Sequence, residues 1–162
     1  MPPITALLQT RNDALRLGRA LETLLPCAEI LIVDHDSSDA TRRVACQYGA
    51  RVVGAIRDAG AQTYLDLARN DWIFCLDSRE SLTESLQVSL FEWGALPPTK
   101  SLDEAPAYSV SRRYQTGDLW LDSSTPEVRL VPRNWTLWCG ELPAYANSAI
   151  LLQGKLLCFA YP

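Results

Sequence analysis

The chain has 162 residues, of which 48% are hydrophobic, and its formal net charge is −4. This length is enough for one domain with a real core, and the composition is ordinary for a globular protein. Nucleic-acid binding is not expected, because it depends on phosphate neutralisation and no Lys/Arg block stands out. No apolar run approaches the roughly 20 residues of a transmembrane segment, and no secretory signal opens the chain. These features predict a cytoplasmic protein, with the inner face of the membrane also allowed.

The cysteines and the single histidine argue against a metal or disulfide scaffold. The five cysteines are widely spaced and odd in number, no CxxC pair exists, and His35 is the only histidine. Most of the cysteines are therefore expected to be small buried hydrophobes in a reducing compartment. A zinc site is not expected.

The first half of the chain alternates between strand-like and helix-like segments. Asn12 or Asp13 is expected to cap the first helix, Ser38 or Asp39 the second, and Gly49 to end the second. This alternation favours a parallel sheet. The expected strands cover residues 4–8, 29–33, 51–53 and 72–76, and the expected helices cover 14–24, 41–48, 60–68 and 83–93.

The pattern changes after Pro97 and Pro98, where the chain becomes β-rich and irregular. Residues 99–106 are expected to form an exposed loop. Strands are expected at 108–114 and 128–131. Residues 150–152 and 156–159 flank Gly154 and are expected either to pair as strands or to pack as an extended tail. One domain with a β-rich annex fits this pattern better than two separate domains.

Two of the expected strands end in aspartate. Asp34 closes the second strand and is followed by Asp36 and Asp39, while Asp77 closes the fourth. Clustered carboxylates repel one another unless something uses their charge, and open α/β sheets bind ligands at the carboxyl ends of their strands. The two strand ends therefore predict a site for a polar ligand. The structural alternative is that Asp36, Ser38 and Asp39 only cap the following helix.

Six short motifs, in the right order and covering nearly the whole chain, together resemble those of glycosyltransferase family 2, which has the GT-A fold. The likeness is greatest to the bacterial branch near the lipopolysaccharide core glucosyltransferases. The segment from Asp34 to Thr41 is moderately specific alone, and the ordered set is much more specific. The motifs are Thr10-Arg11-Asn12-Asp13, Val33 to Thr41, Tyr48 to Val52, Asp71 to Asp77, Arg129 to Arg133 and Gly154 to Tyr161.

The resemblance implies an α/β fold of GT-A type, with a central, mostly parallel sheet flanked by helices and a β-rich C-terminal annex. It implies a single domain, residues 1–162, with a nucleotide-binding α/β half (1–96) and a β-rich acceptor-side half (107–162). The implied activity is inverting transfer of a sugar from a nucleotide-diphosphate sugar to a glycan or lipid-linked acceptor.

The resemblance also assigns roles to particular residues. Asp34 matches the position that holds the nucleotide base and ribose, with Arg11 and Asp36 near it, and a carboxylate suits these N–H and hydroxyl donors. Glu141 stands where family members carry a His-Glu pair, and it is the expected catalytic base. The alternative for Glu141 is an exposed loop glutamate. Of Trp120, Trp135 and Trp138, which lie in the acceptor region of relatives, two are expected to be core.

The chain departs from the family pattern where a metal is normally held. The Asp-x-Asp motif, which binds a divalent ion on the diphosphate, reads Asp77-Ser78-Arg79 here, and Cys158 replaces the histidine of a later Leu-Leu-His segment. Mg²⁺ or Mn²⁺ is implied by the family, but these changes speak against it, and no metal ligand is assigned. Asp77 and Arg79 are expected at the diphosphate, with the guanidinium supplying positive charge. Alternatively, Arg79 is a surface residue of a site that is no longer catalytic.

Two functions therefore remain open at this point. One is a glycosyltransferase that works without a metal, and the other is a catalytically inactive descendant that binds nucleotide or serves as an interaction domain. A different nucleotide-binding protein, such as a nucleotidyltransferase, fits less well, because no Gly-rich phosphate loop follows the first strand.

Overall fold

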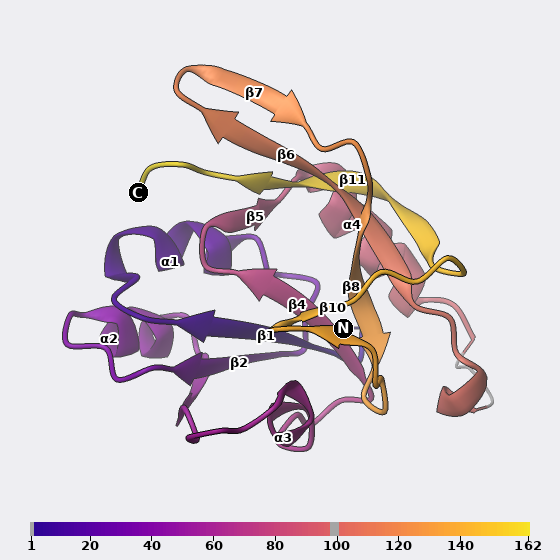
Figure 1. The fold of residues 1–162 in the computed structure, drawn as a ribbon, viewed down its shortest axis with the longest axis horizontal. Coiled ribbons are helices and arrows are strands. Elements are labelled where there is room, and N and C mark those ends of the chain that lie inside the picture. The colour runs from indigo at the N-terminus through magenta and orange to yellow at the C-terminus, as the bar shows by residue number, and fades with distance from the viewer. Residues whose placement is uncertain (1, 98–100) are drawn as a thin grey trace.

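The computed structural model describes residues 2–97 and 101–162, which form one large mixed sheet with helices on both faces (Figure 1). The strand order is β3-β2-β1-β4-β8-β6-β11-β5, and β7 pairs with β6 outside this path. The strands of this sheet are β1 (Ile4–Thr10), β2 (Glu29–Asp34), β3 (Arg51–Gly54), β4 (Trp72–Asp77), β5 (Glu80–Leu82), β6 (Tyr108–Thr116), β7 (Leu119–Asp122), β8 (Glu127–Pro132) and β11 (Ile150–Cys158). A separate two-stranded sheet contains β9 (Trp138–Cys139) and β10 (Leu142–Pro143), and the helices are α1 (Ala14–Glu22), α2 (Thr41–Gln47), α3 (Ala61–Leu65), α4 (Glu84–Gly94) and the 3₁₀ turn η1 (Leu102–Glu104).

The first four strands of the sheet order, β3, β2, β1 and β4, run parallel to one another. After β1 the chain moves outward to β2 and β3, and it then returns to the other side of β1 as β4. The order therefore reverses between β1 and β4, and in open α/β sheets such a switch point is where ligands bind. The α/β class and the mostly parallel first half expected from the sequence are confirmed.

The parallel strands are buried on both faces, which explains why they read as continuous apolar runs. On one face, alternate residues of β1 and β4 pack against α1, α2 and α4, with Leu17, Leu86 and Leu90 fully buried. On the other face, the intervening residues pack against α3, where Tyr64 and Leu65 are buried. Two cores thus hold the strand ends in fixed positions.

The β-rich annex continues the sheet beyond β4. Strand β8 is antiparallel to β4, β6 lies between β8 and β11, and β5 forms the far edge against β11. Residues 150–158 form one continuous strand, which resolves the alternative left open by the sequence. Gly154 has φ +96°, and a Cβ there would lie 2.2 Å from the backbone nitrogen of Leu86, so the close approach of β11 to α4 requires glycine.

Several local expectations were wrong. The sequence did not predict β5 or β7, and α3 is shorter than the segment 60–68. Tyr48, at the end of α2, is 38% exposed, and its hydroxyl donates to Glu22. The loop expected at 99–106 contains η1 in its described part, and residues 99–100 lie outside the described residues. Gly49, with φ +73°, follows the end of α2 as expected.

No helix within the described ranges 2–97 and 101–162 combines the length and apolar character that a membrane crossing needs.

Candidate functional site

The carboxylate of Asp34, at the end of β2, is fully buried and bonded to its own surroundings. It accepts hydrogen bonds from the Thr10 hydroxyl (3.1 Å), from the backbone N–H of Ser37 (3.1 Å) and from Arg42 Nε (2.6 Å). The Ser37 hydroxyl donates to it as well, at 2.5 Å. Burial alone would raise the pKa of Asp34, but these hydrogen bonds outweigh it and hold the pKa below its usual value. Asp34 therefore organises the loop that follows β2.

Asp39 accounts for part of the acidic cluster, because its carboxylate bonds backbone N–H groups at the starts of two helices. Its Oδ1 accepts from the backbone N–H of Thr41, at the start of α2, and its Oδ2 accepts from Ala14 N, at the start of α1. The N-cap residue of α2 is Ala40, which makes no side-chain capping bond, so the expectation that Ser38 or Asp39 occupies the cap position was wrong, and Asp39 bonds the helix start from one residue further out. Asp13 precedes α1 but does not cap it, because its carboxylate accepts from the backbone N–H of Arg11 instead.

Asp36 points the other way and lines a cavity of about 700 Å³ at the carboxyl ends of the parallel strands. Asn12, Asp36 and Asp58, which follow β1, β2 and β3, are the non-glycine residues with positive φ among residues 2–97 and 101–162. Such backbone conformations are uncommon and cluster at functional sites. Two hydrogen bonds to the loop after β2 hold Asn12. Its Oδ1 accepts from the backbone N–H of Ser38, and its own backbone N–H donates to Ser37 Oγ.

This first cavity is lined by polar and apolar groups in similar measure, and Tyr64 is its aromatic residue. The Tyr64 hydroxyl accepts from the backbone N–H of Ile56 at 2.9 Å, which fixes its ring against the cavity. Its polar lining is Gln9, Arg11, His35, Asp36, Arg57, Asp58 and Glu141. The structure therefore brings Arg11, Asp36 and Glu141 together at one cavity, while Asp34 lies outside its lining.

Asp77, at the end of β4, forms an ion pair with Arg79. Arg79 Nε lies 3.0 Å from Asp77 Oδ1, Nη2 lies 3.3 Å from Oδ2, and the Arg79 backbone N–H also donates to Oδ1. Partial burial would raise the pKa of Asp77, but the hydrogen bonds and charge of Arg79 lower it below its usual value. The two side chains expected at the diphosphate are thus in direct contact.

Asp77 lines a second cavity of about 340 Å³, which shares two residues with the first. Gln9 and Glu141 line both cavities, whereas Arg79 lines neither. His35 Nε2 lies 2.7 Å from Gln9 Oε1 and 3.8 Å from Glu141 Oε1. Glu141 therefore stands where the two cavities meet, on the turn between β9 and β10.

Gln9 was missed by sequence reasoning although the sequence carries a signal for it. It is the only amide side chain in the buried strand β1, and it lies one residue from the strand end. A polar side chain at that position of a buried parallel strand indicates a ligand edge. Nothing in the sequence indicates that Gln9 contacts His35.

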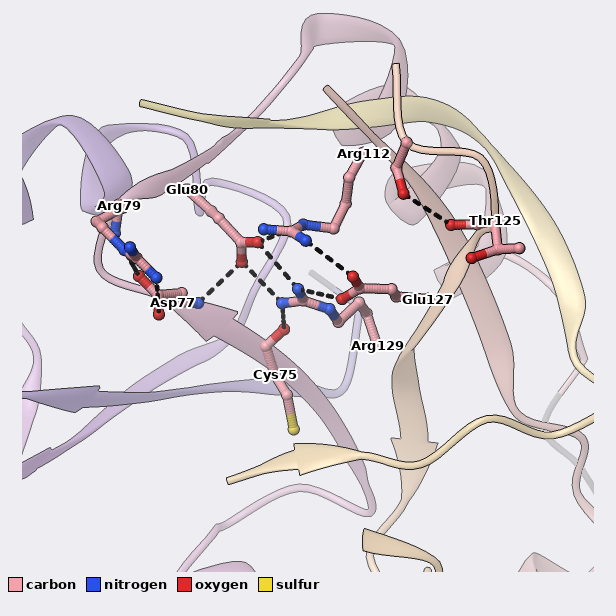
Figure 2. Close-up of polar contacts among 9 residues, drawn as sticks. Cys75, Asp77, Arg79, Glu80, Arg112, Thr125, Glu127 and Arg129 are labelled. Carbon is pink, nitrogen blue, oxygen red and sulfur yellow. Dashed lines mark hydrogen bonds and ion pairs between the residues drawn. The ribbon is translucent and has the colours of Figure 1, made fainter. Parts of the chain in front are cut away.

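Glu80 was also missed, and it lies fully buried beside Asp77 in a cluster of charged side chains (Figure 2). Its carboxylate accepts from Arg129 Nη1 (2.7 Å) and Nη2 (2.9 Å), and it lies 2.8 Å from Arg112 Nε. Glu127 accepts from both arginines at 2.8 Å. We call Glu80, Arg112, Glu127 and Arg129 the Glu80 cluster.

The donor set at Asp77 does not fit Mg²⁺ or Mn²⁺. Among residues 2–97 and 101–162 there is no group of three or more His, Cys, Asp or Glu side chains arranged to hold a metal ion. Hard divalent cations need several oxygen ligands, but a guanidinium occupies both oxygens of Asp77. Cys158 lies opposite Glu80 in the sheet, and burial, followed by the charge of Glu80, raises the pKa of its thiol. A protonated thiol is a poor substitute for a metal-supporting imidazole.

Two of the three tryptophans of the annex pack against the core, as expected. Trp135 and Trp138 lie against the core cluster on the α3 face of the sheet. Trp120, on β7, instead meets Phe159 edge-to-face, with ring centroids 5.1 Å apart.

Comparison with known proteins shows that the chain is similar to glycosyltransferases. An uncharacterized glycosyltransferase of Rickettsia felis is 34% identical over 91 residues, 54% of this chain and 32% of the relative. The lipopolysaccharide core biosynthesis glycosyltransferase LpsC of Rhizobium meliloti is 30% identical over 127 residues, 68% of this chain and 42% of the relative. The chain thus spans less than half the length of these curated relatives. No protein-family model matches it.

Solved structures that align with this chain include the following two, both at low sequence identity. Glucosyl-3-phosphoglycerate synthase from Mycobacterium tuberculosis, in complex with Mn²⁺, UDP and glucosyl-3-phosphoglycerate, aligns over 72% of this chain and 45% of its own, with TM-score 0.49 and 20% identity. Staphylococcus aureus TarS 1–349 in complex with UDP aligns over 75% of this chain and 38% of its own, with TM-score 0.47 and 14% identity.

Proposed function

We propose that this chain binds a nucleotide-diphosphate sugar and transfers the sugar to a glycan or lipid-linked acceptor without a divalent metal. The observation that carries the proposal is the pair of cavities at the carboxyl ends of the parallel strands, which share Gln9 and Glu141. Similarity to glycosyltransferases supports sugar transfer as the chemistry. One cavity suits the nucleoside, and the other suits the sugar and its acceptor.

The larger cavity has the groups that recognise a nucleoside. The exposed carboxylate of Asp36 accepts hydrogen bonds from ribose hydroxyls or a base N–H. Arg11 supplies a cation for the phosphate nearest the ribose. Asp34 contributes through its loop, because its oxygens are already bonded to Thr10, Ser37 and Arg42.

Arg79 takes the part that a metal ion plays in relatives. Half of its side chain is exposed, and its hydrogen bonds to Asp77 use Nε and Nη2. A diphosphate oxygen competes for the same guanidinium and bonds bidentately to it. The positive charge then stabilises the leaving diphosphate as the glycosidic bond to it breaks.

Glu141 acts as the base at the junction of the cavities. The acceptor hydroxyl attacks the anomeric carbon, its proton passes to the Glu141 carboxylate, and the diphosphate leaves from the opposite face with inversion. His35 and Gln9 position Glu141, since His35 Nε2 lies between the Gln9 amide oxygen and the Glu141 carboxylate. Its carboxylate is exposed enough to reach a substrate, with 61% of the side chain accessible.

A second function, nucleotide binding without transfer, is favoured by one observation. The guanidinium of Arg79 occupies both oxygens of Asp77, so the chain lacks the carboxylate pair that holds a catalytic metal in relatives. An inactive descendant would keep the nucleoside cavity and lose turnover.

The test combines binding and turnover. Titration calorimetry with UDP-, GDP-, ADP-, CDP- and dTDP-sugars, in EDTA or in Mg²⁺, identifies the donor, and hydrolysis of that donor by water reports the bond-breaking step. We expect Glu141→Gln to bind the donor normally and to lose about a hundredfold or more in rate, while Glu92→Gln, an exposed residue of α4, behaves as wild type. Binding without turnover in the wild type supports the second function, and no binding of any donor contradicts both.

A further inference from the structure

The Glu80 cluster pairs two fully buried charged side chains, Glu80 and Arg129, with two partly exposed ones, Arg112 and Glu127, of which Glu127 is 36% exposed. Glu80 and Arg129 are 0% and 1% exposed, and Arg112 is 21% exposed. Burial would lower the pKa of Arg129, but Glu80 and Glu127 raise it, so the guanidinium stays charged. The cluster joins three strands of the annex side of the sheet, β5, β6 and β8. Its charges sum to zero.

The cluster is tied directly to the turn that presents Asp77 and Arg79. Glu80 Oε2, which accepts from Arg129, also accepts from the backbone N–H of Asp77 at 3.0 Å. The other side of the same turn is fixed by β11, where the Phe159 N–H donates to the Arg79 carbonyl. Figure 2 shows the Asp77–Arg79 pair beside the cluster, joined to it through Glu80.

Stability alone does not account for such a cluster. Removing charges from water is costly, and replacing a buried ion pair by apolar residues of similar size is often neutral or stabilising. A buried ionic network is better explained by the arrangement that it enforces. Here the group whose position depends on it is the backbone of Asp77.

We propose that the Glu80 cluster is a positioning device, through which the β-rich annex sets the turn 77–79 so that Arg79 meets the donor diphosphate. This inference rests on the proposed function. Arg129 and Arg112 fix the Glu80 carboxylate from β8 and β6. Glu80 fixes the Asp77 amide, and Asp77 Oδ1, which accepts from the Arg79 backbone N–H, fixes the turn that carries Arg79.

The variant that removes the device keeps the charges balanced. Glu80→Leu combined with Arg129→Met deletes one anion and one cation, while Arg112 and Glu127 retain their own 2.8 Å contact. Since such replacements preserve folding in general, the double variant is suited to binding measurements. Glu80→Gln, which keeps the shape of the side chain, is the milder second variant.

A double-mutant cycle separates positioning from structure. We first find which of UDP, GDP, ADP, CDP and dTDP binds the wild type most tightly. That diphosphate and the matching monophosphate are then titrated into the wild type, Arg79→Ala, the double variant and the double variant that also carries Arg79→Ala. We expect Arg79→Ala to weaken diphosphate binding about tenfold in the wild type, the loss of one charge-assisted contact. In the double-variant background we expect less than about a twofold loss. Glu80→Gln is expected to give an intermediate coupling, and monophosphate affinity is expected to stay constant.

An equal loss from Arg79→Ala in both backgrounds would overturn the proposal. If the wild type binds no nucleotide, the proposed function is overturned. Amide hydrogen exchange then still tests whether Glu80 positions the turn 77–79. In that case Glu80→Gln must still speed exchange of the Asp77 amide relative to that of Leu31, a buried residue of β2. Unchanged Asp77 exchange would overturn the positioning role.

Discussion

The turns after β2 and β4 both begin with an aspartate at the end of a buried parallel strand, yet the two carboxylates have different surroundings. Asp34 is fully buried and bonded to Thr10, Ser37 and Arg42. Asp77 is partly exposed, contacts Arg79 and lines a cavity. The same sequence pattern, a strand that ends in aspartate, therefore has two roles. Asp34 stabilises the loop that follows its strand, whereas Asp77 lies at the candidate binding site.

The difference follows from the donors that each turn supplies. The β2 turn is followed by serines, a threonine and the first turn of α2, so donors surround Asp34 on all sides. The β4 turn is only two residues long before β5 begins, and its side-chain donor is Arg79. A short turn leaves its aspartate open to solvent and to a ligand.

The largest expected effect separates Asp34 from its neighbour Asp36. Asp34→Ala leaves the Thr10 and Ser37 hydroxyls without their buried acceptor, and we expect it to lower the free energy of unfolding by about 3 kcal/mol. Asp36→Asn, on the exposed side of the same loop, tolerates the positive φ of that position, so it is the control and is expected to change the free energy of unfolding by less than about 0.5 kcal/mol. Urea unfolding measures both, and equal effects would contradict the separation.

The next effect concerns Asp77 and its ion pair. Asp77→Asn removes a negative charge beside the proposed diphosphate and releases Arg79, so we expect nucleoside diphosphate affinity in EDTA to rise by about 1 kcal/mol, or fivefold. A metal-holding aspartate would give the opposite result. Calorimetric titration reads the change, with Asp71→Asn, at the other end of β4, as the control. Weaker binding would contradict the metal-free account.

The smallest effect is a pH dependence. Because the pKa of Asp34 is lowered in the folded protein, its contribution to stability is present above the unfolded value of about 3.9 and is lost as the pH falls through the folded value. Below about pH 4, Asp34→Asn is therefore expected to reduce the slope of unfolding free energy against pH by at most about one proton. Asp36→Asn is the reference, and parallel slopes in wild type and Asp34→Asn would count against the assignment.

The sequence predicted the parallel half well because its signals are local. Apolar runs mark β1, β2 and β4, and Gly49 marks the end of α2 by its left-handed conformation. Strands β5 and β7 were missed because each is three or four residues long, and pairing with β11 or β6 rather than propensity makes them strands. Tertiary pairing of this kind overrides local pattern.

For the candidate site, the sequence indicated which residues to consider but not the contacts that they make. Motif order singled out Arg11, Asp36 and Glu141, which line one cavity in the structure, and their roles stay predictions. The burial of Asp34 was not readable, because it depends on Thr10, which is 24 residues away. The Glu80 cluster was not readable either, since its members come from three strands whose order is set by the whole sheet.

The central claim is that a guanidinium replaces the metal at the diphosphate. Calorimetric titration of the five nucleoside diphosphates into the wild-type protein, first in EDTA and then in Mg²⁺, tests it directly. We predict that one diphosphate binds in EDTA, that Mg²⁺ does not strengthen this binding, and that Arg79→Ala weakens it about tenfold while Arg43→Ala, on the exposed face of α2, does not. Binding that appears only with Mg²⁺, or that is unchanged in Arg79→Ala, would contradict the account.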